Sequence, residues 1–296
     1  MIPITFGILT LVFSLIHLIP GDPAIQIAGE NARPQDVQQV RHALGLDQPL
    51  GRQYVNYLRN LAHGDLGRSF QTNESVAVQI RQRYPATIQL AFGAMIVALL
   101  VAFPLGIISA IHRNSWIDNV ARFFALIGVS MPSFWFGPLL IIAFAINHPW
   151  LPVSGRDEGL KSLVLPSLTM GLALAAILTR MIRVSLAEEL TQLYVTTAVA
   201  KGVSRNKAIF RHALKNALIP VITVLALQFG SLLTGAIITE QIFSWPGLGR
   251  LLIQSINTRD YPQVQASILV IALTYILVNF ASDLLYGVVD PRIKLE

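Results

Sequence analysis

The chain of 296 residues contains no cysteine. Disulfide bonds are therefore excluded, as are metal and redox centres that need thiolate ligands, while the redox compartment stays open. Charged residues are also scarce, at 13% of the sequence against roughly 25% in an ordinary globular domain. The pattern G-x-x-x-x-G-K-[ST] is missing too, so the chain has no P-loop with which to cradle the phosphates of ATP.

Apolar residues take the place of the missing charges. They make up 53% of the sequence, and the mean hydropathy is +0.58. A helix that crosses the hydrocarbon core of a bilayer needs about 20 mostly apolar residues. Six stretches meet this requirement approximately, namely 2–19, 87–111, 120–146, 163–182, 218–239 and 266–289. Because these runs are continuous rather than alternating, they predict an all-α polytopic membrane protein rather than a barrel.

Two of these stretches leave an alternative open. Pro166 and Gly171 interrupt the fourth, which allows a buried or re-entrant segment in place of a spanning helix. The first is N-terminal and ends near Ala24, as a signal peptide could. It lacks a positively charged start, however, and its apolar run is longer than that of most signal peptides. We therefore expect an uncleaved first helix.

Basic residues in the short loops predict the orientation. The net charge of +6 comes largely from loops, where Lys and Arg mark the cytoplasmic side. The segments between the second and third spans, between the fourth and fifth, and after the sixth all carry such residues. We therefore expect a multi-pass membrane protein with both termini in the cytoplasm. This topology accounts for the positive charge, and no nucleic-acid partner is expected.

The spans divide the chain into three parts, which are a first transmembrane helix at 1–20, a periplasmic helical segment at 21–85 and a five-helix core at 86–296. The periplasmic part predicts two short amphipathic helices, one at 34–44 that stops at Gly45, and one from Pro49 that ends before Gly64. Their apolar stripes are Val37, Val40 and Leu44, and Tyr54, Tyr57, Leu58 and Leu61. The segment is either a cap on the membrane face or a docking platform for an external partner.

One polar stretch, at about 183–217, is too charged to span the membrane. Five basic residues lie in it close together, namely Lys201, Arg205, Lys207, Arg211 and Lys215. The pattern predicts helices at 186–201 and 205–217, separated by a turn in which Gly202 adopts a positive φ and Ser204 caps the second helix. The basic residues alone could serve topology and contact anionic lipid headgroups. That role does not explain why the loop is built as two helices around a turn of small residues.

The same stretch resembles a known family. "TTAVAKG", followed by "NALIP", is similar to the coupling loop of the permease subunits of bacterial ABC importers, and most similar to the dipeptide, oligopeptide and nickel branch. Further similar motifs occur in order along the chain, among them "HLIPGDPA", "GDLGRSF", "GVSMP", "IFSWPGLGRLL", "RDYPQVQA" and "DPRI". Thr196 and Thr197 stand where the general signature has Glu and Ala, so no contact of that Glu is carried over.

This resemblance implies a type I ABC importer permease fold with six transmembrane helices. It also implies a second homologous permease subunit, two cytoplasmic ATPase subunits that bind ATP and Mg, and a periplasmic solute-binding protein. This chain would then be no enzyme, would need no cofactor of its own, and would have membrane lipids around it. The matching positions of the ATPase-coupling interface are Thr197, Ala198, Ala200, Lys201 and Gly202.

Other chemistry has little support in the sequence. No pair of the six histidines has the H-E-x-x-H spacing of a zinc site, so we expect no metal site. Asp283 lies in the last span, about two turns from its end, where pairing or solvation explains it as well as function does. Polar residues within spans usually serve helix contacts, but four are candidates for the translocation path, namely Ser130, Gln228, Ser231 and Asn279.

The expected cargo is a di- or oligopeptide delivered by the binding protein. A nickel or metal-chelate importer is the alternative within the same family, because "RFFALIGVSMPSFWFG" also resembles nickel permeases. A self-sufficient secondary transporter is the alternative outside it. Inverted repeats and charged residues near the midplane would favour that class, and the sequence shows neither convincingly.

Overall fold

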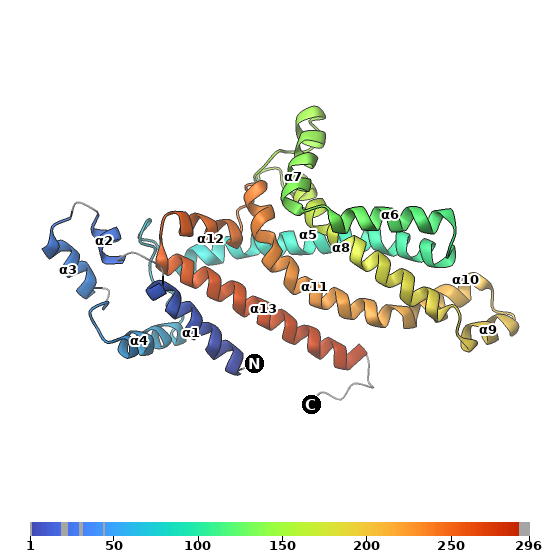
Figure 1. Ribbon diagram of the computed structural model, residues 1–296, viewed down its shortest axis with the longest axis horizontal. Helices are drawn as coiled ribbons and strands as arrows, with labels where there is room; N and C mark the ends of the chain where they lie inside the picture. Colours follow the sequence, from blue (N-terminus) through green and yellow to red (C-terminus); the bar gives the residue numbers. More distant parts are fainter. Residues whose placement is uncertain (1, 19–22, 30–31, 44, 290–296) are drawn as a thin grey trace. The chain divides into compact units, whose positions relative to one another are not determined.

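The computed structural model describes residues 2–18, 23–29, 32–43 and 45–289. This part of the chain is helical and contains no strand, which confirms the predicted all-α class (Figure 1). From the N-terminus, the α-helices of the described residues are α1 (Ile2–Leu18), α2 (Pro23–Ala28), α3 (Pro34–Ala43), α4 (Leu50–Ala62), α5 (Val76–Ile111), α6 (Trp116–Ser130) and α7 (Ser133–Ile141). They are followed by α8 (Leu160–Glu189), α9 (Leu193–Ala200), α10 (Arg205–Lys207), α11 (Leu214–Ile242), α12 (Leu248–Asn257) and α13 (Tyr261–Val289). Two π-helical segments, η1 (Ile142–Asn147) and η2 (Ala208–Ala213), extend α7 and precede α11.

Four helices in the described part of the chain are long and apolar enough to cross a membrane, and a bent pair makes a fifth if it counts as one span. The four lie at Val76–Ile111, Leu160–Glu189, Arg205–Thr234 and Tyr261–Leu284. The first predicted span forms α1, whose 17 residues reach the lower limit of about 17 for a spanning helix. The fourth predicted span is an uninterrupted helix of 30 residues, so the re-entrant alternative is wrong.

The third predicted span, 120–146, is broken into α6 and α7, which meet at an angle of 101°. The break has a local cause in Pro132, which disfavours helical geometry in the residue before it. Met131 accordingly has an extended backbone, with φ −87° and ψ 116°. A bend at this point is a property that hydropathy does not reveal.

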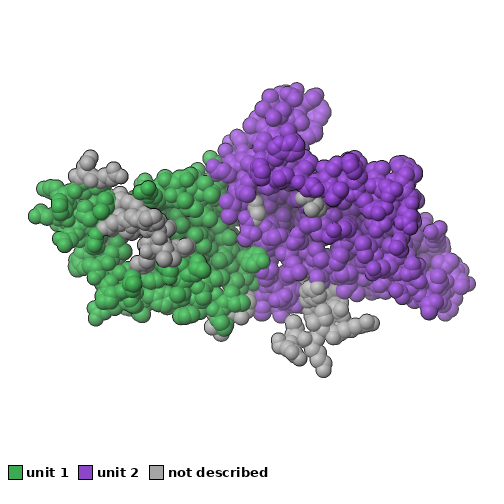
Figure 2. Space-filling view, viewed as in Figure 1, with its two compact units in different colours: residues 1–86, 246–276 green, residues 87–245, 277–296 purple. Residues whose placement is uncertain are grey.

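Backbone contacts divide the chain into two compact units, one of residues 1–86 and 246–276 and the other of residues 87–245 and 277–296 (Figure 2). In the first unit, α4 packs on α1 through aromatic rings. The ring of Phe13 lies 5.1 Å from that of Tyr54 and 5.7 Å from that of Tyr57. The Tyr54 hydroxyl is also hydrogen-bonded to Thr10 Oγ1 at 2.7 Å. Tyr54 and Tyr57, part of the predicted apolar stripe, are half-buried and pack against another helix.

The two predicted helices of the 21–85 segment are confirmed as α3 and α4. Leu44, the last residue of the first prediction, lies outside the described residues. Both helices are followed by a glycine in the left-handed region, Gly45 at φ +66° and Gly64 at φ +75°. Glycine takes this conformation without the steric penalty that a Cβ brings, which explains why the helices end here.

Hydrogen bonds around a buried carboxylate join two loops of the first unit. Asp260, before α13, accepts hydrogen bonds from the Ser69 hydroxyl and from the backbone N–H of Phe70, the latter at 3.1 Å. Ser69 and Asp260 are both buried, and Gln71 Nε2 donates to the Thr258 carbonyl at 3.0 Å. The contact joins "GDLGRSF" to "RDYP", two motifs that the sequence analysis could only note as separate.

Helix α8 is the centre of the second unit, where it packs against α6, α7 and α11. It also approaches α5 closely at Gly171. A Cβ at this position would lie 2.6 Å from the Ala94 carbonyl oxygen and 2.8 Å from Val97 Cβ. Gly171 interrupts the apolar run because α5 and α8 pack too closely here for a larger side chain. Small residues commonly allow such close packing between membrane helices.

Candidate coupling interface

The polar stretch after α8 forms an elbow that extends beyond the ends of α8 and α11 (Figure 1). Helix α8 ends at Glu189, the chain turns through 190–192, and α9 occupies Leu193–Ala200. The predicted single helix at 186–201 is therefore wrong. Its break is a tight turn, in which the N–H groups of Thr191 and Gln192 donate to the carbonyls of Glu188 and Glu189, each at 3.1 Å.

The turn at Gly202 is as predicted. Gly202 has a φ of +90°, its N–H donates to the Val199 carbonyl at 2.9 Å, and the Val203 N–H donates to the Ala198 carbonyl at 3.1 Å. These two bonds form a Schellman motif, which satisfies the carbonyls that the end of a helix leaves free. Apart from its chain neighbours, no atom of the described residues lies within 4 Å of the position that a Gly202 Cβ would take. The turn thus needs glycine for its backbone geometry, and its outer side is open.

The second predicted helix is only partly correct. Ser204 precedes α10, but its side chain makes no capping hydrogen bond. The helix also does not stop at 217, because α10, η2 and α11 follow one another directly from Arg205 to Ile242. The second half of the loop and the fifth predicted span therefore form one continuous helix. Its geometry is α-helical except in η2, where it is π-helical. Such turns occur often at functional sites.

An apolar cluster anchors α9 to the helices behind it. Val195 is buried against residues of α8, η2 and α11, and the cluster consists of Ala110, Leu186, Ala187, Val195, Ala208, Ala213 and Ala217. Val203, directly after the Gly202 turn, packs against the same cluster. Most of these residues are alanines, which allow the helices to lie close together.

Three hydrogen bonds hold the same helices. The Tyr194 hydroxyl on α9 donates to Glu189 Oε2 and accepts from Asn216 Nδ2 on α11 at 3.1 Å. Partial burial and the hydrogen bond to Glu189 raise the pKa of Tyr194 to about 12, so the hydroxyl keeps its proton at physiological pH. The Ser185 hydroxyl of α8 donates to the Ala217 carbonyl of α11 at 2.9 Å. With the cluster, the Tyr194 bonds hold α9 against α8 and α11, and the Ser185 bond joins α8 to α11.

The opposite side of the elbow is exposed. All five predicted coupling residues lie at the end of α9 or in the turn, and all but the half-buried Ala198 are exposed. Large apolar side chains accompany them, since Leu193 is 83% exposed and Phe210 is 55% exposed. Leu190, Val195, Val199 and Ile209 contribute to a groove of about 270 Å³ beside them. Exposed apolar groups next to a groove are typical of a surface that a partner covers.

The sequence analysis missed Leu193, Phe210 and the Tyr194 bridge. The apolar character of Leu193 and Phe210 within a charged stretch was the available signal. The five basic residues of this stretch are all exposed.

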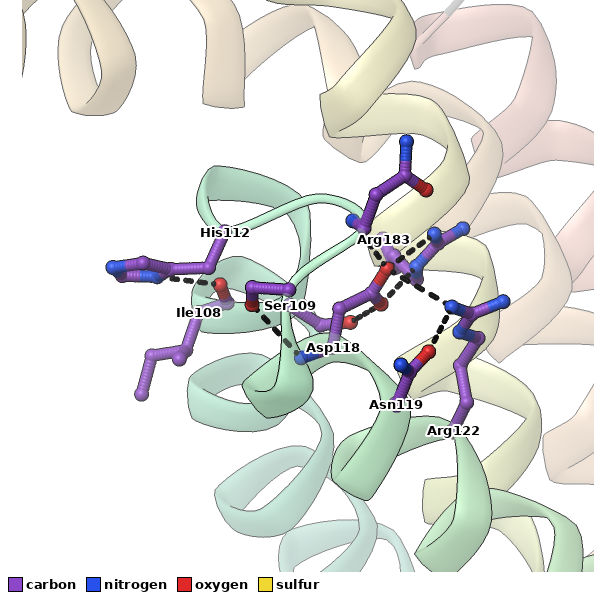
Figure 3. Close-up of polar contacts among 9 residues, drawn as sticks. Ile108, Ser109, His112, Asp118, Asn119, Arg122 and Arg183 are labelled. Atoms are coloured by element: carbon purple, nitrogen blue, oxygen red, sulfur yellow. Dashed lines mark hydrogen bonds and ion pairs between the residues drawn. The ribbon is translucent and has the colours of Figure 1, made fainter.

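A second polar cluster lies where α5, α6 and α8 meet (Figure 3). Asp118 is fully buried and accepts two parallel hydrogen bonds from Arg183, one from Nε at 2.5 Å and one from Nη2 at 2.7 Å. It also accepts from the Ser109 hydroxyl at 2.5 Å and from the Asn114 N–H at 2.9 Å. Arg122 approaches the same carboxylate at 3.5 Å. The sequence analysis included Arg183 only in the basic segment after the fourth predicted span and did not single out Asp118.

The candidates for the translocation path are only partly brought together. Gln228 and Ser231 lie one turn apart on α11, where the Ser231 hydroxyl donates to the Gln228 carbonyl at 2.8 Å. Ser130 ends α6 and is exposed, and Asn279 is a half-buried residue of α13. Asp283 is exposed near the end of α13. Among the described residues, no cluster of three or more His, Asp or Glu side chains could hold a metal ion.

Comparisons with known proteins agree with this architecture. Residues 102–295 match the family described as the inner membrane component of binding-protein-dependent transport systems, and residues 2–91 match the N-terminal region of such membrane components. The chain therefore belongs to this family. It is a multi-pass inner-membrane permease subunit of an ABC importer.

Individual relatives cover almost the whole chain. The dipeptide transport system permease protein DppB of Alkalihalophilus pseudofirmus is 44% identical over 321 residues, which cover 99% of this chain and 96% of that protein. The glutathione transport system permease protein GsiC of Escherichia coli K12 is 44% identical over 296 residues, which cover 100% of this chain and 96% of that protein.

Solved structures support the fold. An inward-facing structure of the MetNI methionine ABC transporter aligns with a TM-score of 0.62 and 15% identity, over 72% of this chain and 96% of that chain. An amino acid ABC transporter aligns with a TM-score of 0.52 and 17% identity, over 73% of this chain and 94% of that chain. These likenesses confirm the predicted permease fold.

Proposed function

We propose that this permease subunit translocates di- or oligopeptides across the inner membrane after a periplasmic solute-binding protein delivers them. The observation that carries the proposal is the equal, nearly full-length identity of 44% to a dipeptide permease and to a glutathione permease. Glutathione is itself a tripeptide, so both relatives are named for cargo with peptide bonds and terminal charges. A chain equally similar to both fits the cargo class that they share.

The energy for transport comes from two cytoplasmic ATPase subunits, and a second homologous permease completes the pathway. In this assembly, Thr197, Ala198, Ala200, Lys201 and Gly202 form the contact with the ATPase. Three features of the elbow support this role. It is exposed, it bears apolar side chains beside a groove, and it is fastened rigidly to α8 and α11 by Val195 and Tyr194. A displacement of the ATPase would then move both long helices.

The elbow lies in the cytoplasm, and both termini lie on the same side. The five exposed basic residues near Gly202 support this orientation, because cytoplasmic loops retain Lys and Arg. The 21–85 segment then faces the periplasm. Its helix α4 exposes Leu50 and Val55, at 58% and 62%, which supports a role as a docking platform in addition to a cap.

Reconstitution of the complete importer tests this function. The permease pair, ATPases and binding protein are placed in proteoliposomes with internal ATP, and uptake of a labelled dipeptide, a labelled tripeptide and nickel is compared. We expect ATP-dependent peptide uptake and no nickel uptake. Nickel uptake without peptide uptake would contradict the cargo, and uptake by this chain alone without ATP would contradict the importer mechanism.

A further inference from the structure

A groove on the second unit lies between α6 and α8 next to the end of α5, and has a volume of about 430 Å³. Three arginines line it, Arg122 from α6 and Arg180 and Arg183 from α8. The rest of its wall is mostly apolar and includes Leu126, Ile177 and Val184. The groove thus combines guanidinium groups with a hydrocarbon surface. Neither the family match nor the coupling elbow accounts for this combination.

The positive charge of the groove is only partly neutralised. The carboxylate of Asp118 accepts two hydrogen bonds from Arg183 and neutralises the charge of this arginine. Arg122 lies at the edge of this pair, 3.5 Å from the carboxylate, with its side chain 51% exposed. Arg180 is exposed, and it makes no hydrogen bond or ion pair within the described residues. Three guanidinium groups facing one carboxylate leave a formal excess of two positive charges.

Arg180 and Arg183 lie in the last third of α8, and Arg122 lies in the middle of the short helix α6. At about 1.5 Å per residue, Arg180 is roughly 14 Å and Arg183 roughly 9 Å from the end of α8, and Arg122 is roughly 9 Å from the start of α6. Trp116 at the start of α6 is 74% exposed, as aromatic residues at the lipid headgroups often are. This depth fits the headgroup layer and the first carbons of the acyl chains.

The outer face of α6 continues the hydrocarbon surface away from the arginines. Phe123, Phe124 and Leu126 are 61%, 61% and 65% exposed, and Leu126 also lines the groove. A ligand that fits both parts has an anionic head and an apolar tail. Basic pockets between transmembrane helices on the cytoplasmic side are suited to such headgroups.

We propose that this groove binds an anionic phospholipid of the cytoplasmic leaflet, whose phosphate contacts Arg122 and Arg180 while an acyl chain lies along α6. Arg183 remains paired with Asp118 and contributes its charge from behind. The bound lipid would brace α6 against α8, the helix that leads to the coupling elbow. This site depends on the membrane location of the chain and not on the nature of its cargo.

The test uses the complete importer, purified and reconstituted into nanodiscs of phosphatidylcholine with 20% phosphatidylglycerol. Phosphatidylglycerol retained after transfer to detergent is measured by native mass spectrometry. Each positive charge near the headgroups contributes to the free energy of binding an anionic lipid. We therefore expect Arg122→Gln and Arg180→Gln each to lower retention about fivefold, and the double variant about twenty-five-fold. Arg113→Gln, which removes an exposed charge in the loop before α6, is the matched control and should leave retention unchanged.

Two additional arms identify the ligand. Inorganic phosphate should not displace the lipid, because it lacks the acyl chain that the apolar wall requires. A photoreactive side chain at Leu126 should crosslink to phosphatidylglycerol. The proposal is overturned if the double variant retains phosphatidylglycerol like wild type, if inorganic phosphate displaces it, or if Leu126 crosslinks to the second permease instead of lipid.

Discussion

Asn216 of α11 donates a hydrogen bond to the hydroxyl of Tyr194 on α9 at 3.1 Å, and the same hydroxyl donates to Glu189 at the end of α8. A single oxygen therefore joins the short exposed helix to both long helices beside it. If the elbow transmits the movement of the ATPase, this oxygen is part of the connection.

The first prediction removes that oxygen. Tyr194→Phe keeps the ring but deletes both hydrogen bonds, each worth about 1 kcal/mol. We expect the subunits to stay assembled while more ATP is hydrolysed per peptide transported. Asn216→Ala should have a similar effect, and the double variant should add little, because both changes break the same bridge. Thr191→Val, which deletes a purely local hydrogen bond to the Glu188 carbonyl, is the control. Full additivity of the two single variants would argue against a shared bridge.

The second prediction concerns the buried pair of Asp118 and Arg183. Arg183→Gln leaves the Asp118 carboxylate buried without its bidentate partner, which should lower the free energy of unfolding by about 3–5 kcal/mol. Arg183→Lys should recover only part of this loss, since an ammonium group cannot make two parallel bonds. The double variant with Asp118→Asn should cost less than Arg183→Gln alone. Chemical denaturation in detergent measures these values, and a Lys variant as stable as wild type would contradict the bidentate role.

The third prediction tests the docking platform. Val55 is 62% exposed on α4, so Val55→Asp should not disturb folding but should place a charge in an apolar contact with the binding protein. We expect uptake at limiting binding-protein concentration to fall about tenfold, with recovery at saturation. Val55→Thr keeps the branched shape and should have a small effect. Unchanged uptake at limiting binding protein would leave the segment only the role of a cap.

The fourth prediction separates backbone strain from partner contact at Gly202. Gly202→Val puts a branched residue at φ +90° and a bulky group on the exposed side, while Gly202→Asn tolerates the left-handed region better. Apart from the chain neighbours of Gly202, no atom of the described residues lies within 4 Å of the new Cβ, so any loss in the Asn variant beyond its residual backbone strain at φ +90° reports on the partner. We expect Val to lower ATPase association at least about thirtyfold and Asn to lower it less.

Lys215→Gln, an exposed change in the first turn of α11, is the control for Gly202 and should keep wild-type subunit retention. The reverse result, with Gly202→Val normal and Lys215→Gln defective, would assign the coupling role to the basic residues.

The features that sequence predicted are those with local causes. Gly202, Gly45 and Gly64 end helices because the conformation they adopt excludes most other residues, and that preference is visible in the sequence. The spans follow from hydropathy in the same way. The bend at Met131 also has a local cause in Pro132, but hydropathy, which the span assignment used, does not register it.

The features that sequence did not predict depend on residues far apart in the chain. Arg183 reaches Asp118 across 65 positions, Asp260 reaches Ser69 across 191, and Asn216 reaches Tyr194 across 22. No local pattern marks such pairs, since each residue alone is an ordinary polar group near the end of a helix or in a loop. The break at 190–192 was missed as well, because no Gly or Pro marks it, and Val195 directly after it packs against residues far away in the chain.

The most direct test of the account is whether the end of α9 touches the ATPase. The chain has no cysteine, so Thr197→Cys introduces a single thiol on the exposed side of the elbow. In the assembled importer, a short thiol-reactive photocrosslinker at this position should capture the ATPase subunit, and ATP binding should change the yield. The same reagent at Leu50→Cys, on α4, should not capture it. Capture of the ATPase from Leu50→Cys but not from Thr197→Cys would contradict the proposed coupling interface.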